Sequence, residues 1–167
     1  MKTLIVTSAP PGSGKSTWCN QYAKTHDNVK IVCSDAIRYE ITKSMRNFDH
    51  QKEVWETFEK RIKEYSKIDD VTVILDALCD LNYLRIKYVV ENPEFDKYIL
   101  VLFPRTFEQC KASNLTRYDR DDKVLPEDAL EMLYKKFEEP SKEALSYFDE
   151  VLEVPFETLY QNQPKNN

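Results

Sequence analysis

Glycine is scarce in this sequence. The chain has 2 glycines in 167 residues, where average usage would give about twelve. Both lie within residues 11–16. Glycine tolerates left-handed backbone and close approach by a ligand. The concentration of both glycines therefore marks one short segment as the place where such a backbone is needed.

Long apolar runs and paired cysteines are also missing. The longest apolar run, residues 98–103, is far shorter than the ~20 residues that span a bilayer, and we expect no signal peptide. The 4 cysteines are scattered, at Cys19, Cys33, Cys79 and Cys110. With only 2 histidines in the chain, this spacing excludes a clustered zinc site. We expect buried thiols in a reducing compartment, the cytoplasm, and no membrane association.

A large excess of positive charge is absent as well. The chain has 29 acidic against 24 basic residues, a net charge of −5. This balance argues against a protein that coats nucleic acid or an anionic membrane non-specifically, but it leaves room for an enzyme with a small basic site. The hydrophobic content of 41% is that of a globular protein. We expect one domain over residues 1–160 and a disordered tail at 161–167.

The hydrophobic pattern predicts alternating strands and helices. Strands are expected at residues 3–8, 29–34, 71–76, 97–103 and 151–154, the last at a sheet edge. Helices are expected from Lys15, at 51–67, 81–90 and 106–113, from Pro126, and at 141–148. The alternation predicts an α/β fold with a parallel sheet of about five strands and helices on both faces. Ligands of such sheets bind at the carboxyl ends of the strands, which here are Ser8, Ser34, Asp76 and Pro104.

The segment 9–16 reads Ala-Pro-Pro-Gly-Ser-Gly-Lys-Ser. It matches the phosphate-binding P-loop pattern G-x-x-x-x-G-K-[ST] except at Ala9, with a predicted strand before it and a helix after it. In such a loop the backbone N–H groups bind phosphate oxygens. Lys15 would contact the β- and γ-phosphates and Ser16 would bind Mg²⁺. The ATP-binding residues predicted in this segment and directly after it are Gly12, Ser13, Gly14, Lys15, Ser16 and Thr17.

Motifs of switch GTPases are absent. Such proteins need D-x-x-G, but Ala9 and Pro11 precede the two glycines by three residues, and no N-K-x-D is present. The chain is also short for a motor ATPase. A small phosphotransferase, in which a second substrate supplies the nucleophile, therefore remains.

Polar residues at two other strand ends suggest the acceptor side of the site. Asp35 and Arg38 follow the second strand and would share a helix face. Asp35 could accept a proton from an attacking hydroxyl, and Arg38 could bind a phosphate on the acceptor. The alternative is that Asp35 caps the helix and Arg38 is an exposed charge. Asp76 ends the most apolar strand, where P-loop proteins carry the acid that supports Mg²⁺ from a second shell.

The segment 114–123 is polar and highly charged, and we interpret it as a mobile lid. Arg117 and Arg120 could close over the nucleotide and offset charge on the transferring phosphoryl group. The interleaved Asp119, Asp121 and Asp122 also fit a plain solvated loop.

Several segments together resemble the kinase domain of bacteriophage-type polynucleotide kinases. They are residues 11–18, 34–39, 74–76, 114–117 and 123–126. The resemblance implies a P-loop kinase core with an Arg-bearing lid, located in the bacterial host cytoplasm if phage-encoded. It implies transfer of the γ-phosphate of ATP, with Mg²⁺, to a 5′-hydroxyl end of DNA or RNA.

The same resemblance implies roles for individual residues. Lys15 and Ser16 would act on ATP and Mg²⁺, and Asp76 would support Ser16. Asp35 would be the general base, Arg38 would bind the 3′-phosphate of the acceptor, and Arg117 would be the lid arginine. The family often has a further arginine where this chain has Ser113.

Two other functions remain open. A related P-loop kinase could phosphorylate another hydroxyl, on a modified DNA base, a nucleoside, an antibiotic or a sugar nucleotide. A non-catalytic module could bind the nucleotide and signal through its lid. The choice between DNA and RNA, between single strand and duplex end, and the oligomeric state also stay open.

Overall fold

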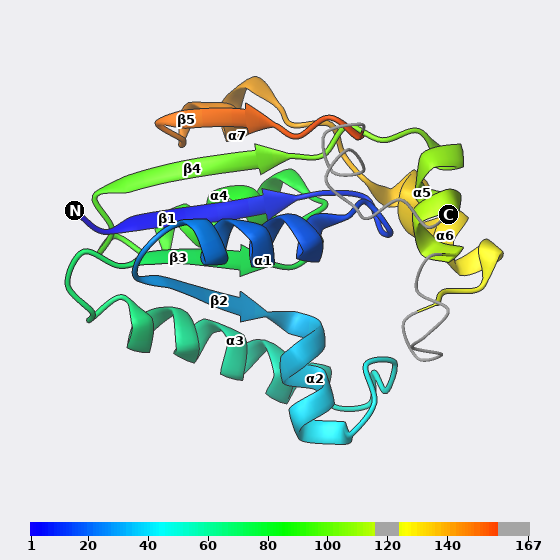
Figure 1. The fold of residues 1–167 in the computed structure, drawn as a ribbon, viewed down its shortest axis with the longest axis horizontal. Helices are drawn as coiled ribbons and strands as arrows, with labels where there is room; N and C mark the ends of the chain where they lie inside the picture. The colour runs from blue at the N-terminus through cyan, green and yellow to red at the C-terminus, as the bar shows by residue number, and fades with distance from the viewer. Residues whose placement is uncertain (116–123, 157–167) are drawn as a thin grey trace.

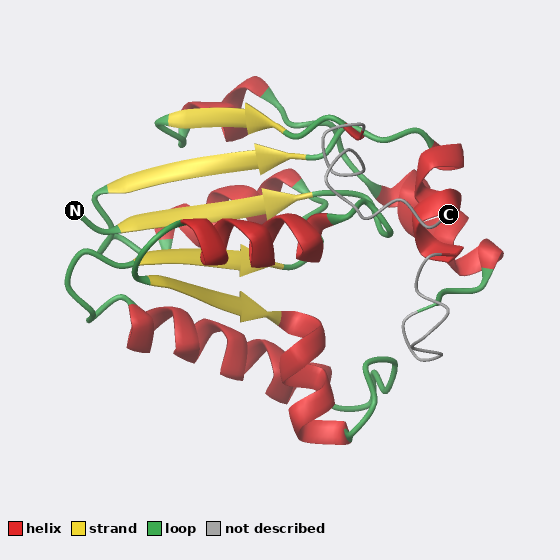
Figure 2. Ribbon diagram, in the orientation of Figure 1, coloured by secondary structure: helices red, strands yellow, loops and turns green. Residues whose placement is uncertain are grey.

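The structure, a computed structural model, describes residues 1–115 and 124–156 (Figure 2). The lid arginines Arg117 and Arg120 lie outside the described residues. So do the predicted domain limit at residue 160 and the tail at 161–167.

Five strands form one parallel sheet in the order β2-β3-β1-β4-β5 (Figure 1). They are β1 (Thr3–Ser8), β2 (Val29–Cys33), β3 (Thr72–Asp76), β4 (Lys97–Leu102) and β5 (Glu150–Glu153). Every paired strand runs parallel to its neighbour. The predicted fold class is confirmed, including the position of the last strand at an edge.

Helices cover both faces of the sheet. The helices of the described chain are α1 (Lys15–Thr25), α2 (Ser34–Thr42), α3 (Gln51–Tyr65), α4 (Asn82–Val90), α5 (Phe107–Leu115), α6 (Glu127–Lys136) and α7 (Lys142–Ser146). On one face Cys19 of α1 packs against Ile5 and Ile74. On the other face Phe58 of α3 and Tyr88 of α4 pack against the alternate strand residues. The period of two along each strand thus supplies two cores, one on each face.

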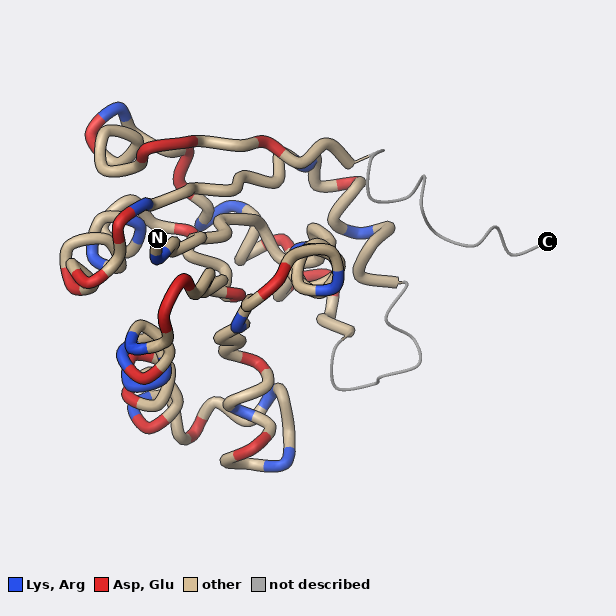
Figure 3. The backbone as a smooth tube through the Cα atoms, turned by 60° about the vertical axis from the view of Figure 1, so that its left-hand side comes forward, with Lys and Arg blue, Asp and Glu red and all other residues tan. Residues whose placement is uncertain are grey.

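Acidic and basic residues alternate along the described chain rather than forming long stretches of one sign (Figure 3). The exposed side of α3 shows the arrangement, with Lys52 3.9 Å from Glu56 and Lys60 4.0 Å from Glu64. Exposed pairs of this kind contribute little to stability. No helix among the described residues is long and apolar enough to cross a membrane.

The carboxyl ends of the strands converge, as parallel pairing requires. β1 runs into the glycine segment, β2 runs directly into α2, and Cys33 at the end of β2 pairs in register with Asp76. Figure 1 shows α2, α5 and α6 beyond this end of the sheet. This end therefore gathers the polar residues that the sequence placed at strand ends.

Two local predictions were wrong. Asn114 and Leu115 belong to α5 rather than to the polar segment that follows. Asn114 is buried, and its amide makes reciprocal hydrogen bonds with the backbone of Leu125, at 2.8 and 3.0 Å. The sequence predicts that Leu130, Leu133, Tyr134 and Phe137 form the buried face of the helix from Pro126, but only Leu130 is buried in α6. Leu133 lines a cavity, and the Tyr134 hydroxyl donates to the Arg105 carbonyl.

Candidate nucleotide and acceptor site

The glycine segment has the backbone that the sequence suggested. Gly12 and Gly14 have φ of 69° and 87°, in the left-handed region, and Gly14 is the N-cap of α1. A Cβ added at Gly12 would lie 2.9 Å from the carbonyl oxygen of Cys110 in α5. Ala9 is buried without a left-handed φ, so the position where the motif usually has glycine does not need it here.

We expect Gly12→Ala to lower the free energy of unfolding by about 1–2 kcal/mol from backbone strain alone. The close approach to Cys110 adds to this cost. Urea unfolding of Lys43→Gly is the control, because Lys43 also has a φ of 64° but caps α2 away from the loop. Lys43→Gly should raise stability, and a Gly12→Ala protein as stable as wild type would contradict this account of the loop.

Asp76 contacts the Lys15 and Ser16 side chains at the end of the P-loop. The Lys15 ammonium lies 2.9 Å from Asp76 Oδ1, and the Ser16 hydroxyl donates to Asp76 Oδ2 at 2.9 Å. Asp76 has 4% and Lys15 13% of its side chain exposed, so the ion pair is largely shielded from water. The Cys33 thiol, whose pKa burial raises to about 11, also hydrogen-bonds Asp76.

The ion pair sets the charge states of both partners. Burial alone would raise the pKa of Asp76, but Lys15 and Ser16 outweigh it and hold that pKa below its ordinary value. Burial alone would lower the pKa of Lys15, but Asp76 outweighs it and raises that pKa, with a further contribution from Asp35. Both groups are therefore charged at neutral pH.

Arg105 holds the P-loop through a hydrogen bond to its backbone. The sequence does not predict this role. Its Nε donates to the Ser13 carbonyl at 3.0 Å, and its Nη1 donates to the carbonyls of Pro104 and Val154 at 2.8 and 2.7 Å. These bonds tie the P-loop to the ends of β4 and β5. The only signal in the sequence is an arginine directly after a strand end.

Asp35 and Arg38 form an ion pair one helical turn apart on α2. Arg38 Nη1 lies 2.7 Å from Asp35 Oδ1, and Arg38 Nε donates to Gln51 Oε1 at 3.1 Å. Arg38 Nη1 also reaches the Met45 carbonyl at 3.4 Å, and the guanidinium lies 4.7 Å from the centre of the Phe48 ring.

The structure does not favour the alternative in which Asp35 caps the helix and Arg38 is an exposed charge. Arg38 is 4% exposed rather than a surface charge. Cys33, not Asp35, is the N-cap of α2, and no side chain caps this helix. The Asp35 side chain is half exposed, which leaves its second oxygen accessible to a ligand.

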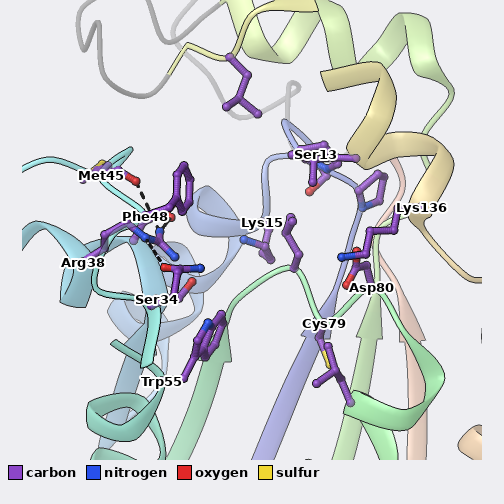
Figure 4. Close-up of a pocket in the computed structure, with 18 of the residues that line it drawn as sticks. Ser13, Lys15, Ser34, Arg38, Met45, Phe48, Trp55, Cys79, Asp80 and Lys136 are labelled. Atoms are coloured by element: carbon purple, nitrogen blue, oxygen red, sulfur yellow. Dashed lines mark hydrogen bonds and ion pairs between the residues drawn. The ribbon is translucent and has the colours of Figure 1, made fainter. Parts of the chain in front are cut away.

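A cavity of about 600 Å³ joins the P-loop to this ion pair (Figure 4). Figure 4 shows Lys15 near its centre, Arg38, Phe48 and Trp55 on the side of α2 and α3, and Asp80 and Lys136 on the other side. Its remaining wall includes residues of α4 such as Tyr83, Leu84, Lys87 and Tyr88. Trp55 packs against the core and also lines the cavity.

The other predicted site residues are placed as follows. Ser13 is buried and its hydroxyl has no hydrogen-bond partner among the described residues. Thr17 is exposed in the first turn of α1. Ser113 is buried in α5, next to Asn114. Arg117 and Arg120 fall outside the described residues, so the lid role stays a prediction.

The residues near Lys15 also suit Mg²⁺. Ser16 and Asp76 offer hard oxygen ligands, which Mg²⁺ prefers, and Mg²⁺ commonly takes only one or two protein ligands together with phosphates and water. Among residues 1–115 and 124–156 no group of three or more His, Cys, Asp or Glu side chains could hold a metal on its own. The donor set therefore fits an ion shared with bound phosphates.

Comparison with known proteins identifies the family of this chain. A family model described as an AAA domain, AAA_33, matches residues 4–140. The chain belongs to this AAA-domain family. A search of curated proteins gives no match. The AAA domain thus includes the P-loop, the Asp35–Arg38 pair and Asp76.

Solved structures share the fold of this AAA domain at low sequence identity. Kti12 of Chaetomium thermophilum, in complex with ADP-AlF3, has a TM-score of 0.68 at 16% identity, over 95% of this chain and 94% of that one. A chain of the Pnkp1/Rnl/Hen1 RNA repair complex has a TM-score of 0.70 at 21% identity, over 89% of this chain and 46% of that one. A gluconokinase from Sinorhizobium meliloti 1021 has a TM-score of 0.58 at 15% identity, over 97% and 84%.

These likenesses show a P-loop nucleotide-binding, kinase-like fold. The chain spans 46% of the matched chain of the RNA repair complex. The shared fold does not identify the acceptor of this chain.

Proposed function

We propose that this AAA domain is an ATP- and Mg²⁺-dependent polynucleotide kinase that phosphorylates 5′-hydroxyl ends of DNA or RNA. The observation that carries the proposal is the Asp35–Arg38 pair, which lines the same cavity as the P-loop. A carboxylate beside a phosphate-binding loop suits a general base, and an arginine beside that carboxylate suits an anionic acceptor. The resemblance to bacteriophage-type polynucleotide kinases and the fold shared with the RNA repair chain support the same choice.

The P-loop residues bind and orient the triphosphate of ATP. The backbone N–H groups around Gly12, Ser13 and Gly14 surround the phosphates, and α1 begins directly behind them. The Lys15 ammonium, charged and already positioned by Asp76, contacts the β- and γ-phosphates. Bound Mg²⁺, held by Ser16 with Asp76 behind it, would neutralise charge on the phosphates.

Asp35 removes the proton of the acceptor hydroxyl. The hydroxyl oxygen forms a bond to the γ-phosphorus, the bond between that phosphorus and the β,γ-bridging oxygen breaks, and ADP leaves. The hydroxyl proton passes to Asp35. Its Oδ1 is engaged by Arg38, so Oδ2 is the oxygen available for the proton. Arg117 is proposed to offset charge on the transferring phosphoryl group.

Arg38 argues for a phosphate-bearing acceptor. Its Nε and Nη1 are engaged by Gln51, Asp35 and Met45, which fixes the guanidinium and leaves Nη2 for a ligand. Phe48 and Trp55 on the same side of the cavity offer aromatic faces to a nucleobase. A neutral acceptor would make no use of the positioned guanidinium.

A kinase for another hydroxyl is the second candidate, favoured by the fold shared with gluconokinase. A sugar acid has a carboxylate that Arg38 could also bind. Transfer from γ-labelled ATP separates the candidates when the acceptors are 5′-hydroxyl DNA and RNA oligonucleotides, nucleoside 3′-monophosphates, hydroxymethylated DNA blocked at its 5′ end, and gluconate. Oligonucleotide labelling is expected. Labelling of gluconate or blocked DNA alone would favour the second candidate, and ATP binding without any transfer would favour a signalling module.

We expect Arg38→Ala to raise KM for acceptors carrying a 3′-phosphate by about tenfold or more, because a charge-assisted hydrogen bond is lost. Acceptors without that phosphate should be affected far less. Arg61→Ala is the matched control, since Arg61 of α3 is ion-paired with Glu40 of α2 and does not line the cavity. Steady-state kinetics on the two acceptor types measures the difference, and an equal rise for both would remove the role assigned to Arg38.

A further inference from the structure

Arg46 lies in the connection between α2 and α3 and lines the cavity. Its Nε and Nη2 atoms are buried and have no hydrogen-bond partner among residues 1–115 and 124–156. The backbone N–H of Arg46 donates to the Ser44 hydroxyl at 3.2 Å. The preceding residue, Met45, accepts from Arg38 through its carbonyl, so the segment that carries Arg46 lies on the Arg38 side of the cavity.

Buried guanidinium donors without acceptors are costly in a folded protein. Three other cations that line the cavity have carboxylate partners: Lys15 pairs with Asp76, Arg38 with Asp35, and Lys87 with Glu59 at 2.8 Å. These three carboxylates are therefore engaged by other cations and do not satisfy Arg46. A buried and unsatisfied donor group of this kind therefore indicates a ligand that brings its own acceptor.

We infer that Arg46 is a second anion-binding residue of the acceptor site, so that the preferred acceptor carries two negative phosphate charges near its reacting hydroxyl. This inference rests on the proposed function, and it restricts the preferred acceptors to those that carry two phosphate charges. The segment that carries Arg46 is bonded to Arg38 through the Met45 carbonyl, which assigns the anion to the acceptor and not to ATP. The two charges come either from one terminal phosphomonoester or from two successive phosphodiesters.

Three acceptors with a free 5′-hydroxyl separate these sources. A dinucleoside monophosphate has one charge, a nucleoside 3′-monophosphate has two on one phosphorus, and a trinucleotide with a 3′-hydroxyl has two on separate phosphates. Wild type should prefer one or both doubly charged acceptors, and the preferred one identifies the source. Arg46→Gln should lower kcat/KM for that acceptor by about tenfold and leave the dinucleoside monophosphate nearly unchanged. Equal effects on all three would overturn the inference.

A binding measurement tests Arg46 without relying on transfer. Inorganic pyrophosphate is titrated calorimetrically into protein whose P-loop is saturated with Mg²⁺ and a non-hydrolysable ATP analogue. Arg46→Gln should weaken binding by about tenfold, Arg46→Lys by less, and the ion-paired control Arg61→Gln not at all. Absence of binding to wild type, or equal binding to Arg46→Gln, would overturn the inference. If pyrophosphate binds as expected but no nucleotide accepts phosphate, the proposed function fails and the anion site stands.

Thermal unfolding distinguishes a binding role from a structural one. Because Nε and Nη2 of Arg46 satisfy no other group in the described chain, their removal should leave the melting temperature of Arg46→Gln unchanged or higher. A clear fall in melting temperature would show that Arg46 supports the fold, and would overturn the assignment.

Discussion

Asp35→Asn is expected to lower kcat for phosphate transfer by about 10²–10⁴-fold, the usual contribution of a positioned general base. The amide cannot take the hydroxyl proton, but its oxygen can still accept from Arg38, which lies 2.7 Å from the carboxylate. Affinity for ATP should stay near that of wild type, because the P-loop contacts are intact. Single-turnover transfer and nucleotide titration measure the two quantities separately.

The matched control for Asp35→Asn is Asp49→Asn. Asp49 is an exposed acid in the connection between α2 and α3, and its loss should leave kcat unchanged. Near-normal turnover of Asp35→Asn would contradict the general-base role. A loss of ATP affinity as large as the loss of kcat would instead make Asp35 part of the nucleotide site.

Asp76→Asn is expected to destabilise the protein by about 3–5 kcal/mol, because removing one partner of a buried ion pair leaves the other charge uncompensated. The uncompensated group is the Lys15 ammonium, which is 13% exposed. Urea unfolding at pH 7 measures the effect. Asp70→Asn is the control and should change little, since Asp70 pairs with the N-terminus at the surface.

A second substitution tests whether the cost comes from the pair. Lys15→Met in the Asp76→Asn background should recover part of the lost stability, because no buried charge then remains unpaired. If the two substitutions lower the free energy of unfolding additively, the proposed coupling between Lys15 and Asp76 is contradicted.

The lowered pKa of Asp76 gives the same pair a pH signature. A carboxyl whose pKa is lower in the folded state stabilises the protein above its unfolded pKa, near 3.8, and the contribution is lost as pH falls further. The stability difference between wild type and Asp76→Asn should therefore be constant near neutral pH and shrink below that value. A difference that does not change with acidification would argue against an ionised Asp76.

The fold was largely predictable from sequence because its signals are local. The apolar run before Asp76 and the two glycines around Ser13 each indicate a structure within a few residues. The boundaries moved by a residue or two, as at α5, where Asn114 bonds Leu125 across the segment between them.

The residues that hold the P-loop and line the cavity were harder to predict from the sequence. Arg105, Trp55 and Arg46 are unremarkable in the sequence, because their significance comes from distant segments. The role of Arg105 depends on its bonds to the carbonyls of Ser13 and Val154. The role of Arg46 depends on the burial of two guanidinium nitrogens in the cavity wall. Such contacts depend on tertiary packing, which no local pattern encodes.

The most direct test of the proposed function is the position of the transferred phosphate. A 5′-hydroxyl oligonucleotide labelled from γ-labelled ATP is digested to nucleotides, and the labelled species is identified. The account predicts label on the 5′-terminal nucleotide alone, in wild type and not in Asp35→Asn. Label on internal nucleotides, or transfer only to an acceptor without any 5′-hydroxyl end, would contradict it.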